Sequence, residues 1–183
     1  MSEKMKSVYT LGAEDGLVIG PLMAATVVLI GASTYVPWLA LVGWVFIVAV
    51  PVVAYIRLAS TRKVNPAMVR FSPLWLRGIC MFFFGGLIMA IVSIVMMRWV
   101  VPDFMKHLFD NLIEVYGKID DPAAAQVLTV LRKVEETNSL PTPLDVALEM
   151  LYFAVFSGSI LSMIYAVIIK RRSPVPPRFN GFS

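Results

Sequence analysis

Residues 71–104 read FSPLWLRGICMFFFGGLIMAIVSIVMMRWVVPDF. Between Arg77 and Arg98 lie about twenty consecutive residues without a charge, which is the length of a helix that crosses a hydrocarbon layer of about 30 Å. The chain before this stretch is basic or apolar, whereas the chain after it becomes acidic within a few residues. The stretch therefore predicts a membrane-spanning helix that separates two compartments.

The composition of the whole chain agrees with this interpretation. The 183 residues are 58% hydrophobic and 15% charged, with a mean hydropathy of +0.78, whereas soluble domains are about a quarter charged. Four uncharged apolar runs have spanning length, namely residues 17–35, 38–56, 78–97 and 151–169. We therefore expect an all-α integral membrane protein in which residues 1–183 form a single membrane domain with four transmembrane helices.

The distribution of charge predicts an orientation for these helices. The N-terminal tail, the loop between the second and third spans and the C-terminal tail hold eleven basic and three acidic residues, whereas the other side holds five basic and nine acidic residues. Because basic loops stay in the cytoplasm, we expect both termini to be cytoplasmic, including the proline-rich tail at 173–183. Residues 102–146 then form an extracytoplasmic helical loop.

Basic residues flank the spans on the expected cytoplasmic side. Their interrupted pattern beside membrane helices favours lipid headgroups over nucleic acid as the partner. Glu14 and Asp15 precede the first apolar run, in a helix that we expect to begin near Gly12, and they should lie at the same headgroup level. The residues expected to contact lipid headgroups are Arg57, Arg62, Lys63, Arg77, Lys170, Arg171 and Arg172.

The outer loop has the pattern of two amphipathic helices. Asp121-Pro122 is a helix start with an N-cap and a proline at the first position, and Thr142-Pro143 repeats the device with Asp145 at the capping-box position. The fourth spanning helix should therefore begin near Pro143 and project its first turns beyond the bilayer. The expected apolar faces are Phe104, Leu108, Leu112, Val115 and Ile119 in one helix, and Ala124, Val127, Leu128, Leu131 and Val134 in the next.

Small residues at every fourth position predict close packing between helices. They serve either the contacts among the four helices of this chain or a contact with another copy or a partner. In the second span, Pro51 removes a backbone hydrogen bond and predicts either a static kink or a gating hinge. The helix-packing residues are Gly12, Gly16 and Gly20 in the first span, Gly86 in the third, and Gly158 and Ser162 in the fourth.

One group of residues has the types that bind metal ions. Asp103, His107, Asp110 and Glu114 share one face of the first loop helix, but no second histidine or cysteine completes a site. A solvated acidic face explains the same pattern. The chain has no phosphate loop, HExxH, GxSxG or CxxC motif. We therefore expect no metal, no cofactor and no catalytic residue, and treat these four side chains as weak metal candidates.

Two acidic residues lie near the start of the fourth span. Asp145 and Glu149 are candidates for an ion or substrate contact at the outer mouth of the bundle, although acids near a helix N-terminus are also favoured by the helix dipole. Proton-coupled transport normally needs ionisable residues inside the spans. The four apolar runs contain none.

Several short motifs resemble the domain of unknown function 4199 family, small four-helix inner-membrane proteins found mostly in Bacteroidetes. The resemblance covers most of the chain and implies a four-helix fold in the bacterial inner (cytoplasmic) membrane without established catalytic residues. It also implies an accessory role beside a membrane-associated glycosyltransferase. The residues that carry the resemblance are Trp99, Pro102, Asp103 and Phe104 at the exit of the third span, with Thr142, Pro143, Gly158 and Ser162.

These observations favour a non-enzymatic membrane protein, an accessory or scaffold subunit that binds a membrane partner or lipid. The alternative is a small transporter or channel for a lipid-linked or small substrate, with Pro51 and Glu149 as working parts. A homo-oligomer is compatible with either, and no nucleic-acid partner is expected.

Overall fold

The computed structural model describes residues 7–61, 69–102, 104–137 and 140–172, and all regular structure in these residues is helical. Four helices are long and apolar enough to cross a membrane, which confirms the predicted number of spans. Some predictions fall outside the described residues, namely those for the lipid-headgroup candidates Arg62 and Lys63, the metal candidate Asp103 and the tail at 173–183. The helices are α1 (Val8–Ala32), α2 (Leu39–Ala59), α4 (Phe71–Val95) with its π-helical continuation η2 (Met96–Val100), α5 (Phe104–Gly117), α6 (Pro122–Glu136) and α7 (Pro143–Arg171).

The helix α1 begins earlier than its apolar run indicates. Ser7 caps it by accepting a hydrogen bond from the backbone N–H of Thr10 at 3.2 Å, so the helix starts at Val8 and includes Glu14 and Asp15. Its polar first turns therefore belong to the same rigid helix as its apolar part. Within this helix, Asp15 is buried in the bundle.

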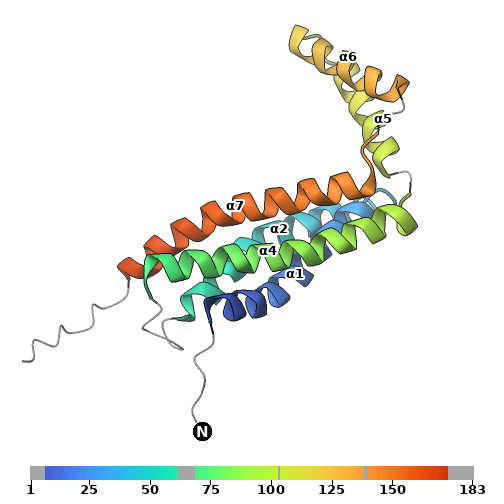
Figure 1. Cartoon of the computed structure of the whole chain (residues 1–183). Coiled ribbons are helices and arrows are strands. Elements are labelled where there is room, and N and C mark those ends of the chain that lie inside the picture. The colour runs from blue at the N-terminus through green and yellow to red at the C-terminus, as the bar shows by residue number, and fades with distance from the viewer. Residues whose placement is uncertain (1–6, 62–68, 103, 138–139, 173–183) are drawn as a thin grey trace, which may run out of the picture.

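The central pair of the bundle is α1 and α4, which pack side by side along their length (Figure 1). A Cβ atom added at Gly12, Gly16 or Gly20 would lie only 2.5–2.6 Å from side-chain carbons of α4. The stripe of small residues in α1 therefore faces α4, where it permits close approach of the two backbones. The facing residues are Cys80, Phe84 and Ile88.

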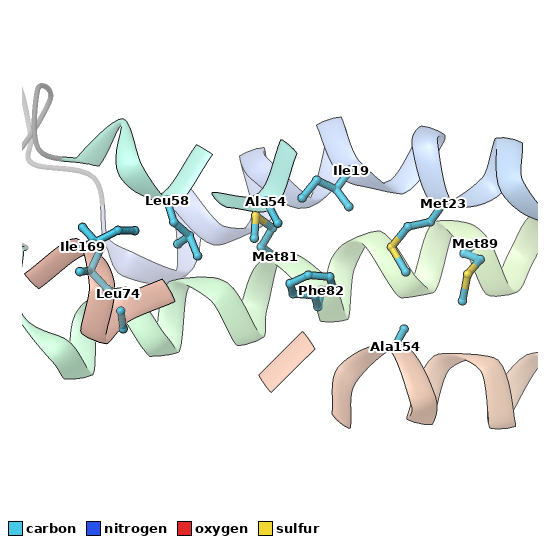
Figure 2. Packing of buried hydrophobic residues seen from close by; sticks show 11 residues of the cluster. Ile19, Met23, Ala54, Leu58, Leu74, Met81, Phe82, Met89, Ala154 and Ile169 are labelled. Atoms are coloured by element: carbon cyan, nitrogen blue, oxygen red, sulfur yellow. The ribbon is translucent and has the colours of Figure 1, made fainter. Parts of the chain in front are cut away.

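The helix α7 covers a second side of α4. Gly158 lies against Phe82, and the buried side chain of Ser162 lies against Gly78. In contrast, α2 packs mainly on α1 and makes few contacts with α4 and α7. The core nevertheless draws residues from all four spans, as Figure 2 shows for the ten labelled side chains. The second span is thus the most loosely held helix of the bundle.

Between η2 and α7, the helices α5 and α6 pack on each other and extend away from one end of the bundle (Figure 1). The capping prediction is confirmed: Asp121 accepts a hydrogen bond from the N–H of Ala123 at 2.8 Å, and Thr142 and Asp145 form a complete capping box. The predicted face of α6 matches its burial, with Ala124 buried. The remaining residues of that face are half-buried at Leu128, Leu131 and Val134 and exposed at Val127.

The predicted apolar face of α5 is wrong in part. Leu108, Val115 and Ile119 are 39–56% exposed. The helix carries a second apolar stripe, which is half-buried, as are Phe104 and Leu112 of the predicted face. The half-buried residues that were not predicted are Phe109, Ile113 and Tyr116.

Candidate functional site

A buried ionic cluster joins three of the four spans. Asp15 of α1 is 4% exposed and Arg77 of α4 is 7% exposed. Two nitrogens of Arg77 contact Oδ2 of Asp15, Nη2 at 2.6 Å and Nε at 2.8 Å. Nη1 of Arg77 donates to the hydroxyl of Thr61, which in turn donates to the carbonyl of Leu58. Both charged side chains are therefore paired and hydrogen-bonded, as burial in a bundle requires.

A second arginine lies beside the same carboxylate. Nε of Arg57 in α2 is 3.4 Å from Oδ1 of Asp15. The Arg57 side chain is 39% exposed, so it lies at the edge of the cluster. Asp15 consequently contacts α2 and α4 at once and ties both helices to α1.

The cluster changes the interpretation of three residues. Asp15 was expected at the headgroup level, and Arg77 and Arg57 were expected to contact lipid headgroups. The structure buries Asp15 and Arg77 against each other, because the first turns of α1 bring Asp15 beside the start of α4. Lys170, Arg171 and Arg172 are exposed, and Arg172 lies 3.5 Å from the hydroxyl of Tyr55.

A sequence signal for this pair exists in the stripe of small residues. Asp15 precedes Gly16, and Arg77 precedes Gly78, so both charged residues adjoin positions where helices approach closely. Charge counting assigned the two residues to the same membrane side but could not show that they meet. Their pairing depends on the register of α1 against α4.

A cavity of about 550 Å³ lies between α2 and α7, with its floor formed by α1 and α4. This volume is within the range of about 300–1,000 Å³ that is typical of small-molecule sites. Its lining is apolar apart from one charged residue and two hydroxyls. The lining residues are Met23, Thr26, Ile47, Val50, Pro51, Phe82, Met89, Glu149, Met150, Phe153, Ala154, Ser157 and Leu161.

The two hydroxyls in the cavity are already satisfied. Thr26 donates to the carbonyl of Leu22 at 3.1 Å, and Ser157 donates to the carbonyl of Phe153 at 2.6 Å. Within the part of the chain that the structure describes, Glu149 makes no hydrogen bond or ion pair. Glu149 is therefore the lining residue whose polar group is not used by the described part of the protein, and its side chain is exposed.

The packing of α7 on α4 fixes the depth of Glu149. Ser162 faces Gly78, Gly158 faces Phe82, and Ala154 faces Gly86, so each step along α4 matches one step back along α7. Continuing this register places residue 149 level with residue 91 of α4. Trp99, expected at the outer interface, is then about 12 Å further along the helix axis at 1.5 Å per residue.

The register compares the start of α7 with the third span. Figure 1 shows that α4 continues past the start of α7, because η2 extends the third span through Val100. Glu149, an exposed residue of α7, thus lies alongside the third span, although its own apolar run begins only at residue 151.

The structure brings Pro51 and Glu149 to one cavity, as the alternative interpretation of the sequence required. The carbonyl of Pro51 accepts a hydrogen bond from the hydroxyl of Tyr165 in α7 at 3.1 Å. Tyr165 also packs edge-to-face on Tyr55, with ring centroids 5.4 Å apart. These contacts join α2 to α7 at one end of the cavity.

The weak metal candidates do not form a site in the described residues. No group of three or more His, Cys, Asp or Glu side chains there is arranged to hold a metal ion. Glu114 instead accepts a hydrogen bond from Lys118 at 2.6 Å. This hydrogen bond and the lysine charge lower the pKa of Glu114.

The four apolar helices and their buried charges define the class of small multi-pass α-helical membrane proteins. Within that class, residues 14–171 match the family described as "Protein of unknown function (DUF4199)", and the chain belongs to this family. The resemblance noted in the sequence is therefore confirmed. No curated protein and no solved structure matches the chain.

Proposed function

We propose that this protein is a non-enzymatic component of the bacterial cytoplasmic membrane that holds the apolar chain of a lipid between α2 and α7. The observation that carries the proposal is the cavity of about 550 Å³ with its apolar lining. An occupant of this space must itself be largely apolar, because the hydroxyls of Thr26 and Ser157 are used within their own helices.

The loose attachment of α2 supports entry of a chain from the bilayer. The contacts of α2 with α7 centre on Tyr165, which bonds to Pro51 and packs on Tyr55. Beyond these contacts the two helices are separated by the cavity. A lipid chain can therefore enter from the side without crossing a polar barrier.

The accessory role that we propose includes a membrane partner. The exposed apolar residues Leu108, Val115 and Ile119 of the α5–α6 pair are available for such a contact. In the orientation that the charge distribution favours, both termini are cytoplasmic and this pair is outside. The family resemblance makes a membrane-associated glycosyltransferase a suitable first partner to test, and a second copy of the chain is the other.

Lipid retention tests the proposal. We expect Ser157→Phe to fill the cavity and to reduce the lipid that co-purifies in mild detergent, as measured by mass spectrometry of the intact complex. The matched control is Ile160→Phe, which adds a ring to an exposed position of α7 outside the cavity lining. Equal lipid content in the two variants and the wild type would contradict lipid binding in this cavity.

Transport is the second candidate, and the specific observation in its favour is that Pro51 and Glu149 line the same cavity. A transporter would give substrate flux in reconstituted vesicles that Glu149→Gln abolishes. A lipid-holding subunit would retain its lipid and give no flux in the same vesicles.

A further inference from the structure

We propose that Glu149 makes the cavity selective for an amphiphile with a cationic amine head and a long apolar chain. This inference rests on the proposed function, because it names the class of lipid that the cavity holds. Three observations carry it: the depth of Glu149, the absence of a partner for its carboxylate in the described residues, and the apolar lining around it.

The depth of Glu149 makes an unpaired charge unfavourable there. The register of α7 on α4 places residue 149 about 12 Å from the level of Trp99 along the bundle axis. Carboxylates inside the hydrocarbon zone pair with a cation or line a functional path. Glu149 is exposed on α7 beside the cavity, so a cation carried by an occupant would stabilise its ionised carboxylate at this level.

The protein does not supply that cation from its described residues. Arg77 is held by Asp15 and Thr61, and Arg57 lies beside Asp15. Lys118 pairs with Glu114 outside the bundle. In contrast to Asp15, Glu149 thus has no ion-pair partner among the described residues. An ammonium group of the occupant can form this ion pair.

The rest of the cavity suits a flexible apolar chain. The lining of α7 runs from Glu149 to Leu161, about 18 Å along the helix at 1.5 Å per residue. Met23, Met89 and Met150 contribute side chains that adapt to irregular shapes. A second apolar cavity of about 160 Å³ shares Met89 and Met150, so the chain can extend on either side of the carboxylate.

The experiment compares three photoactivatable probes of equal chain length that end in a primary amine, an alcohol or a carboxylic acid. Each probe is added to the full-length protein in lipid nanodiscs, and labelled residues are mapped by mass spectrometry. We expect the amine to label cavity residues about tenfold more than the alcohol, since a charge-assisted hydrogen bond is replaced by a neutral one. The carboxylic acid should label them least.

The variant Glu149→Gln should remove the amine preference while leaving alcohol labelling unchanged, and Glu149→Asp should retain much of the preference. The matched control is Glu135→Gln, which neutralises an exposed acid of α6. Equal labelling by amine and alcohol in the wild type, or a preference that survives Glu149→Gln, would overturn the inference and leave lipid binding intact. Equal labelling by the amine and the alcohol is also the result expected if Glu149 is neutral and donates a hydrogen bond to an uncharged head group. Absence of cavity labelling by all three probes would overturn the proposed function as well.

Discussion

Asp15 and Arg77, sixty-two positions apart in the sequence, form an ion pair with an Nη2–Oδ2 distance of 2.6 Å inside the helix bundle. Arg77 also bonds to Thr61 at the end of α2, so the pair connects α1, α2 and α4. Since α2 packs mainly on α1 and has few other contacts with α4 and α7, this connection adds a polar link between α2 and α4. Glu149 forms no comparable ion pair with the described residues. Its carboxylate can therefore interact with an occupant of the cavity.

Removal of one partner of the ion pair should be strongly destabilising. Asp15→Ala leaves Arg77 buried without a counter-charge, and we expect a loss of about 3 kcal/mol in the free energy of unfolding. Thermal unfolding of the purified protein in detergent measures the change. Arg171→Ala, which removes an exposed arginine, is the control and should have little effect.

A double variant separates charge pairing from packing. Asp15→Leu combined with Arg77→Met removes both charges and should recover much of the stability that either single change loses. If the double variant is no more stable than Asp15→Ala, the pair does not account for the loss.

The close approach of α1 and α4 gives a second prediction. A Cβ at Gly16 would lie 2.6 Å from Cβ of Phe84 and 3.0 Å from the carbonyl of Met81, so Gly16→Val must separate the two helices. We expect a loss of about 2 kcal/mol or more from such overpacking, read from the same unfolding measurement. Gly117→Ala is the matched control, because no atom lies within 4 Å of the position of its added Cβ.

Sequence patterns were sufficient for features that depend on local chemistry. Twenty uncharged residues identify a span, and Thr142 with Asp145 identifies a helix start, because each signal is complete within a few neighbouring positions. The position of Glu149 could not be obtained in this way. Hydropathy places it outside the fourth span, and only the register set by Gly86, Phe82 and Gly78 against α7 shows its depth.

Because local patterns do not show long-range packing, the placements of Asp15 and Arg77 at the headgroup level also differ from the structure. Counting basic and acidic residues treats Asp15 and Arg77 as independent surface charges, whereas their pairing arises from helix packing between distant segments. In α5 there are two apolar stripes, and periodicity alone does not decide which one is buried. Phe109, Ile113 and Tyr116 are half-buried, whereas Leu108 and Val115 are exposed.

The ion pair on α5 predicts a pH dependence. The hydrogen bond from Lys118 lowers the pKa of Glu114 below its ordinary value of 4.5. A lowered folded-state pKa means that the contribution to helix stability is present above the unfolded pKa and is lost as the pH falls through the folded pKa. Lys118→Met should therefore raise the pKa of Glu114, as measured by NMR titration, and should abolish the acid sensitivity of α5. An unchanged pKa in this variant would mean that the pair does not form in solution.

Accessibility of single cysteines tests the orientation on which the outer role of the α5–α6 pair depends. In a Cys80→Ser background, a cysteine at Glu135 of α6 should react with a membrane-impermeant maleimide added to intact cells, because the charge distribution predicts that the acidic segments face away from the cytoplasm. A cysteine at Arg171, at the end of α7, should react only after the membrane is opened. These two positions lie on opposite sides of the four spans, so each serves as the control for the other.

The reverse pattern would place α5 and α6 in the cytoplasm, where the proposed partner contact through Leu108, Val115 and Ile119 would have to be sought instead. The cavity and its carboxylate would be unaffected, because their place in the bundle depends on helix register and not on which side is outside.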